Sequence, residues 1–150
     1  MPDLAVHALL TGVVIRPFRR LARYLGPALL GSILPDLISR PVKMMHPALL
    51  DLGQGLHAPL IVMALAAALA LAYPPGHRVG IAAAIGIAGL AHQAIDLLQD
   101  PVGPGYPLLF PLSWQTFPQG PLHPEGSLLA LPLLAAAAVV VWWRWGRGAV

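Results

Sequence analysis

Ionisable side chains within apolar stretches constrain this chain more than any other feature of its sequence. Asp36 ends the string LPD (34–36), and His92 and Asp96 lie within AHQAID (91–96). The surrounding chain is 57% hydrophobic and only 10% charged, with a mean hydropathy of +0.72. Because a carboxylate or an imidazole is costly in hydrocarbon, each needs water, a polar partner or a metal ion. These few residues are therefore a better guide to function than the Leu and Ala around them.

Length and composition favour one helical membrane domain over residues 1–150. Leu and Ala dominate the apolar residues, and Val and Ile do not alternate with polar residues at a period of two, which favours helices over a transmembrane barrel. The absence of cysteine excludes disulfides and thiolate metal ligands. The net charge is only +3, and the basic residues lie at segment ends, which argues against a nucleic-acid partner. The predicted fold class is thus an all-α integral membrane bundle.

Hydrophobic runs predict about five membrane segments. They are expected over residues 4–15, 25–39, 57–73, 79–98 and 128–143, the first two being short or tilted. A Pro-rich external loop is predicted over residues 99–126.

Sequence signals also suggest how these segments begin and end. The string Pro74-Pro75-Gly76 should end the third segment abruptly, and Ser127 should cap the last one. Asp3 stands where a signal peptide carries basic residues, so no cleavable signal is expected.

The distribution of Lys and Arg predicts the orientation of these segments. With the N-terminus outside and the C-terminus inside, seven of the nine basic residues are cytoplasmic. Only Arg40 and Lys43 then lie outside. We therefore expect a multi-pass protein of the cell membrane with this orientation.

The same orientation places five possible metal ligands from four helices at one depth, on the external side. His92 and Asp96 are four residues apart, so on a helix their side chains share one face, about 6 Å apart at Cβ. Imidazole nitrogen and carboxylate oxygen are standard zinc ligands. A quartet would suffice for one ion, and Asp96 could bridge to a second. The full set is His7, Asp36, His57, His92 and Asp96.

Each of these residues also has an ordinary structural interpretation. A single H-x-x-x-D pair is common in helices as a polar seam, His57 suits a helix start, and Asp36 suits the lipid headgroup region. Arg40 and Lys43 are typical interfacial anchors, although an anionic substrate could use them. The remaining candidates are expected to be solvated loop histidines (His46, His77, His123) and an aromatic belt (Trp142, Trp143, Trp145).

The order of four elements resembles a known family. His7, GSILPD (31–36), LHAP (56–59) and AHQAIDLLQDPVG (91–103) are similar in order and spacing to the predicted membrane-bound metal-dependent hydrolases of the YdjM-like family, over residues 1 to about 112. That family is in turn similar in motif order to zinc-dependent phospholipase C.

The resemblance implies specific roles for the matching residues. It implies that Asp36, His57, His92 and Asp96 hold one zinc ion, and that His7 and Asp96 hold a second. The chain departs from the family where Ile38 replaces an acidic residue and where no basic residue precedes His57. It also shows no later His/Glu set for the third zinc of the phospholipases.

Two functional hypotheses follow. The first is a membrane-embedded zinc-dependent hydrolase of an ester or phosphoester, lipid-like by the site's position at the outer membrane–water interface, with Asp36 or Asp96 acting as a base. The second is a non-catalytic metal-binding or structural accessory subunit of a membrane complex, since Gly80, Gly86 and Gly89 permit close helix approach to partners. A transporter is a weaker third hypothesis, because the segments show no repeat.

Overall fold

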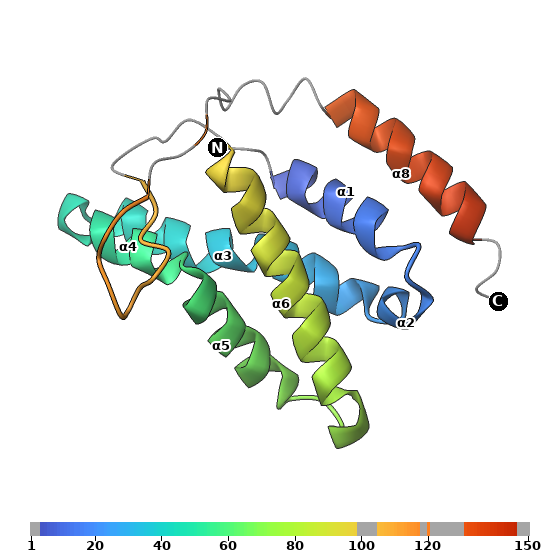
Figure 1. Cartoon of the computed structure of the whole chain (residues 1–150), viewed down its shortest axis with the longest axis horizontal. Helices are drawn as coiled ribbons and strands as arrows, with labels where there is room; N and C mark the ends of the chain where they lie inside the picture. The colour runs from blue at the N-terminus through green and yellow to red at the C-terminus, as the bar shows by residue number, and fades with distance from the viewer. Residues whose placement is uncertain (1–3, 99–104, 118–119, 121–130, 147–150) are drawn as a thin grey trace.

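Apolar runs interrupted by proline, glycine and arginine fold into a series of helices. The computed structural model describes residues 4–98, 105–117, 120 and 131–146, and its regular elements there are helical, with one isolated antiparallel bridge between Tyr106 and Phe117. The prediction of an all-α fold is confirmed. The elements are α1 (Leu4–Ile15), α2 (Arg19–Ala22), α3 (Leu25–Met45), the short 3-10 helix η1 (Pro47–Leu49), α4 (Leu50–Leu56), α5 (Pro59–Ala70), α6 (Pro75–Leu97) and α8 (Leu131–Gly146) (Figure 1).

Helix boundaries match the sequence prediction at α1 and differ elsewhere. Helix α3 continues past residue 39 to Met45, so much of the connection expected there is helical. Pro35 and Pro41 lie inside α3, where each removes a backbone donor. Packing of α3 against α6 and α4 outweighs that local cost.

The third and fourth predicted segments begin at different residues from those expected. Helix α5 starts at Pro59, and His57 instead caps the C-terminal end of α4. Helix α6 starts at Pro75 rather than at residue 79, because proline suits the first turn of a helix, where its missing N–H needs no partner. The string Pro74-Pro75-Gly76 therefore starts a helix, after α5 has ended at Ala70.

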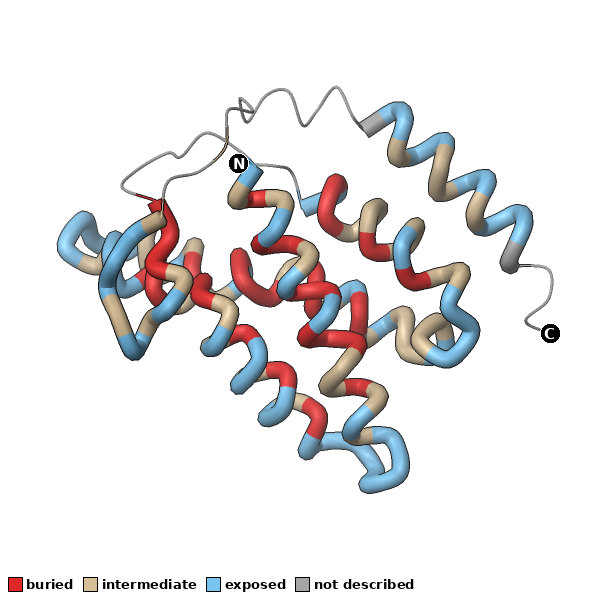
Figure 2. Tube along the Cα trace, in the orientation of Figure 1, coloured by how far each residue is buried: buried red, intermediate tan, exposed pale blue. Residues whose placement is uncertain are grey.

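The helices pack around the crossing of α3 and α6. Helix α5 runs beside α6, α4 folds back onto the C-terminal part of α3, and α1 packs on α3 with α8 on its outer side (Figure 1). Buried positions gather where α3, α5 and α6 face one another (Figure 2). The core there consists of Leu34, Ala66, Ala70, Ile81 and Ile85.

Glycines allow the close approach of α6 to its neighbours. A Cβ atom on Gly31 would overlap the backbone of Ile85, so α3 and α6 touch at main-chain distance. On α6, a Cβ on Gly89 would overlap the Val62 side chain of α5. The position of α6, and of the polar residues in its last turns, therefore depends on these small residues.

The expectation of five crossing helices is not supported. Of the described helices, only α6 is long and apolar enough to cross a membrane, and a second span arises only if η1 and α4 are joined to α5 across a 66° bend. A 12-residue helix such as α1 or α5 is about 18 Å long, against a hydrocarbon core of about 30 Å. Helix α3 is long enough to cross a membrane, but it carries three charged residues, Asp36, Arg40 and Lys43.

The predicted external loop is described only in part. Residues 105–117 and 120 are described, whereas the rest of 99–126 and Ser127 lie outside the described residues. Within the described part, Tyr106 is buried. This segment thus contributes a side chain to the interior.

We expect Gly31→Ala to lower the free energy of unfolding by about 1–3 kcal/mol, the usual cost of forcing a methyl group into a packed interface. Gly26→Ala, in the same helix, is the matched control, because a Cβ there meets no atom within 4 Å. It should leave stability unchanged or raise it, since Ala favours helix. Thermal unfolding of the two purified variants measures this. Equal stability of the two would contradict the main-chain contact of α3 with α6.

Candidate metal centre

The structure brings the five predicted ligands into one buried cluster. His7 lies in the first turn of α1, Asp36 in the middle of α3, and His57 at the break between α4 and α5; the elements can be followed in Figure 1. His92 and Asp96 occupy the last two turns of α6. All five are buried, although they come from parts of the chain up to 89 residues apart. Their convergence is a property of the tertiary fold.

Four of the five side chains form a group of metal-ligating geometry. Asp36, His57, His92 and Asp96 each offer one ligand atom, and these atoms lie within 4.8 Å of one another. His7 is outside this quartet, but its Nε2 lies 3.5 Å from Asp96 Oδ1. The structure thus places His7 beside Asp96, next to the quartet.

Asp96 is the centre of the cluster. Its Oδ2 lies 2.9 Å from His57 Nε2 and 3.2 Å from His92 Nε2. The His7 ring is stacked on the His92 ring, with centroids 3.8 Å apart. Three imidazoles therefore approach the one carboxylate from α1, from the α4–α5 break and from its own helix.

The two quartet histidines are held by their second ring nitrogens. His92 Nδ1 lies 2.6 Å from the backbone oxygen of Ser32, which can only accept, so Nδ1 donates this hydrogen bond. His57 Nδ1 lies 3.2 Å from Ser39 Oγ. Histidine ligands of metals are usually oriented by such a bond to the other nitrogen. Both Nε2 atoms are thus directed into the cluster.

Asp36 has its own positioning partner. Arg40, one turn further along α3, approaches Asp36 Oδ2 to 2.5 Å through Nη2. This pair fixes one carboxylate oxygen and brings a positive charge beside the cluster. Arg40 thus contacts a predicted ligand rather than serving only as an interfacial anchor.

Three further residues build the site, and the sequence analysis did not select them. Ser39 supports His57, the Gln93 side chain donates to the backbone oxygen of His57, and Tyr106 donates to Asp96 Oδ2 at 3.4 Å. Ser39 and Gln93 lie within three residues of predicted ligands, so their positions beside the motifs were an available signal. Tyr106, whose ring stacks on His57, comes from a Pro-rich segment without periodicity, and no local pattern indicates it.

Several atoms of the cluster have no hydrogen-bond partner among the described residues. These buried atoms are both ring nitrogens of His7, Nε2 of His92 and Oδ1 of Asp96. Buried polar atoms are normally satisfied, so this concentration indicates unused ligand capacity. Imidazole nitrogens and carboxylate oxygens suit zinc and other divalent first-row metals, and two carboxylates balance a divalent charge. The quartet could therefore hold a metal ion.

A small apolar cavity reaches the cluster at Asp36. Its volume is about 170 Å³, and Arg40 lines it together with Asp36. Its other lining residues are apolar and come from α1 and α3: Leu4, Ile33, Leu37 and Pro41. This cavity gives an apolar group access to one predicted ligand.

Lys43 adds a second cation at the edge of the cluster. Its Nζ is buried without a hydrogen-bond partner among the described residues, and it lies 5.6 Å from the centroid of the Tyr106 ring. Burial lowers the pKa of Lys43 below its ordinary value of 10.5, while the carboxylates of Asp36 and Asp96 oppose that shift. Lys43 thus brings a second basic group, after Arg40, to the α3 side of the cluster.

The remaining histidines and tryptophans take other positions. His46 is exposed and accepts a bond from Ala48 N at 3.1 Å, and His77 is exposed beside Tyr24. Trp142 and Trp143 are exposed on α8. His123 and the side chain of Trp145 lie outside the described residues.

Comparison of the chain with protein-family models, with curated proteins and with solved structures gives no match. The site must therefore be interpreted from its own geometry.

We expect Asp96→Asn to lower bound divalent metal by at least about tenfold, because the change removes the charge at the atom on which three imidazoles converge. Elemental analysis of the purified protein measures this. Asp51→Asn is the matched control, since Asp51 is exposed on α4 and outside the quartet. Unchanged metal content in the Asp96 variant would limit this residue to a supporting role.

Proposed function

We propose that this chain is a membrane-associated, metal-dependent hydrolase that acts on an amphiphilic phosphoester. The observation that carries the proposal is the buried quartet of Asp36, His57, His92 and Asp96, in which both histidines are oriented through Nδ1. A purely structural cluster of polar residues would be expected to satisfy its own hydrogen bonds. This one leaves atoms of His92 and Asp96 without hydrogen bonds among the described residues. Kinship with the YdjM-like family is part of the same proposal.

Zinc is the proposed metal, held by the quartet, with His7 and Asp96 as the pair that would hold a second ion. When bound, zinc polarises an ester or phosphoester oxygen and lowers the pKa of water to about 7. The protein's part is to hold the imidazoles in place from Ser32 and Ser39 and to surround them with buried helix faces.

Of the two predicted bases, Asp36 is better placed to take a proton from water. It lines the cavity, so water and substrate arriving there meet its carboxylate first. Asp96 is enclosed by three imidazoles and accepts a bond from Tyr106. We therefore assign proton transfer to Asp36, where its carboxylate is not fully engaged with metal, and keep Asp96 as a metal ligand.

The charges beside the site favour a phosphoester over a neutral ester. Two carboxylates offset one divalent ion, so Arg40, which is paired with Asp36, and Lys43 would leave the site with an excess of positive charge that favours an anionic group. The cavity at Asp36 is lined mainly by apolar side chains, which suits the hydrocarbon part of a lipid-like substrate. The two features together describe an amphiphile with a phosphate-containing head.

A membrane setting is supported by the exposed side chains. Large apolar residues are exposed on α5, α6 and α8, and soluble monomers rarely expose so many together. They include Leu60 and Met63 of α5, Val79, Ile87 and Leu90 of α6, and Leu133, Val139 and Val140 of α8. We propose that the helices of this chain are embedded in a membrane, with α6 crossing it.

Hydrolysis should require both the metal and the apolar part of the substrate. Removal of metal with a chelator should abolish turnover of a long-chain phosphodiester, and added Zn²⁺ should restore it. A short-chain analogue with the same head should be cleaved at least about tenfold more slowly, because it buries little surface in the cavity. Release of the head group, followed by chromatography, measures both rates. Stoichiometric metal without turnover would favour the accessory-subunit hypothesis instead.

The orientation can be tested separately. With the N-terminus outside, a reporter fused after Val150 should be active only in its cytoplasmic form, because Arg144 and Arg147 then follow the positive-inside rule. An external reporter signal would reverse the orientation and place the metal cluster on the cytoplasmic side. Fusion after Pro74, between α5 and α6, should report the cytoplasm as well.

A further inference from the structure

A second site is indicated by the cavity between α1, α3 and α8, away from the metal cluster. Its volume is about 480 Å³, within the range of about 300–1,000 Å³ that small-molecule sites occupy. Apart from Arg16, its lining residues are apolar, and they include Leu29 of α3 and Ala138 of α8. None of the five predicted metal ligands lines it.

Small residues on α1 leave room for this cavity beside the contact of α1 with α8. Ala5, Ala8 and Gly12 recur at intervals of three and four residues and so share one helix face. Small residues at such spacing usually bring two helices into close contact. Here a Cβ on Gly12 would meet no atom within 4 Å, so the space is left open. Helix α1 therefore lines an elongated slot of about 16 Å from Ala5 to Arg16.

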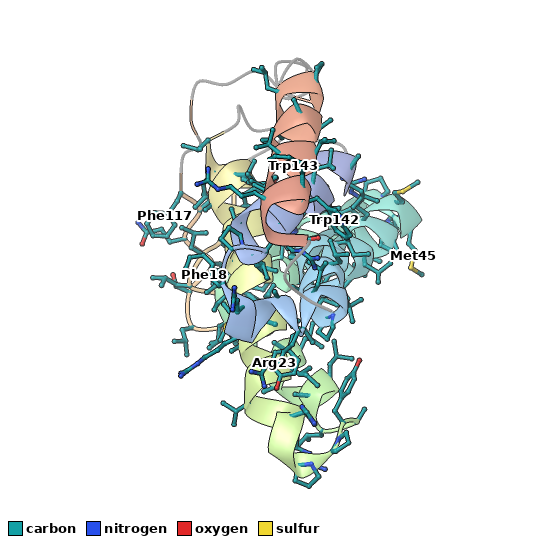
Figure 3. All side chains as sticks on the ribbon, turned by 90° about the vertical axis from the view of Figure 1, so that its right-hand side faces the viewer. Phe18, Arg23, Met45, Phe117, Trp142 and Trp143 are labelled. Atoms are coloured by element: carbon teal, nitrogen blue, oxygen red, sulfur yellow. The ribbon has the colours of Figure 1, made fainter. Side chains whose placement is uncertain are left out.

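A cation stands at one end of the slot. Arg16 follows α1 directly, and its guanidinium carbon lies 4.4 Å from the centroid of the Trp142 ring on α8. Figure 3 looks onto α8 and labels Trp142. The Nε atom of Arg16 is buried and has no hydrogen-bond partner among the described residues. Such a donor in an apolar cavity is costly unless it meets an acceptor, and an anionic one gives the strongest bond.

We propose that this slot binds a single-chain anionic amphiphile of the long-chain fatty acid class, with its carboxylate at Arg16 and its hydrocarbon chain along α1. An extended apolar slot with one cation at its end matches one chain with one charged head. The site is separate from the metal cluster, since none of the five predicted ligands lines the slot and its cation, Arg16, follows the end of α1, whereas His7 lies in the first turn.

The test uses the purified full chain in a neutral detergent and the fluorescence of tryptophan. A stearate dibrominated next to its carboxylate quenches tryptophan only in contact, so binding with the head at Arg16, beside Trp142, gives saturable quenching. The methyl ester of the same acid should bind at least about tenfold more weakly, because it lacks the charge for Arg16. Trp142→Phe should remove the saturable component of quenching.

Variants of the protein distinguish recognition of the ligand's carboxylate from recognition of its hydrocarbon chain. Arg16→Gln should lower the affinity for the acid at least about tenfold, leave that for the ester unchanged, and be rescued in large part by Arg16→Lys. Arg20→Gln is the matched control, since Arg20 is an exposed residue of the same basic cluster and does not line the slot. Ala138→Phe should abolish binding of both ligands by filling the slot. Equal affinities of the wild-type protein for acid and ester, or an unchanged affinity in Arg16→Gln, would overturn the proposal.

Discussion

The main-chain contact between α3 and α6 is the constraint on which the candidate site depends. Gly31 has no side chain, so the backbone of Ile85 reaches α3 directly. One residue after Gly31, the Ser32 carbonyl accepts from His92, which lies two helical turns beyond Ile85. Asp36 follows one turn after Ser32 and meets Asp96, one turn after His92. A shift of the crossing between α3 and α6 would therefore move all of these pairs apart at the same time.

Burying a carboxylate among helices is unfavourable unless groups around it compensate. Asp96 obtains part of that compensation from hydrogen bonds with His57 and Tyr106, with His92 and His7 close by. The compensation is incomplete, because Asp96 Oδ1 and His92 Nε2 keep no hydrogen bond among the described residues. A cluster that is assembled from four parts of the chain and still lacks partners could hold a ligand. A divalent cation suits its donors and its charge.

Helix α1 connects two chemically different ends of the molecule. At its start, His7 joins the metal cluster, and just after its end Arg16 closes the apolar slot under α8. Between them, the small residues of α1 leave room for the slot beside the contact of α1 with α8.

Local patterns in the sequence predicted part of this structure. The apolar run over residues 4–15 became α1 with the same bounds, because the run ends at a basic residue followed by proline. The four-residue spacing of His92 and Asp96 placed both on one face of α6, as helical geometry requires. Where local and tertiary preferences compete, the prediction was wrong: α3 continues through Pro41, and His57 caps α4 instead of starting α5.

The sequence by itself determined the helical class, the identity of the ligand-type residues and the pairing of His92 with Asp96, because each follows from the spacing of neighbouring residues. Only the tertiary structure decided that Ser39 and Tyr106 would support His57 and Asp96, and that Arg16 would lie over Trp142. Those contacts join residues that are distant in the chain or lie in segments without periodicity. They depend on where α3 and α6 cross. That crossing is possible because Gly31 has no side chain, which lets the backbone of Ile85 approach.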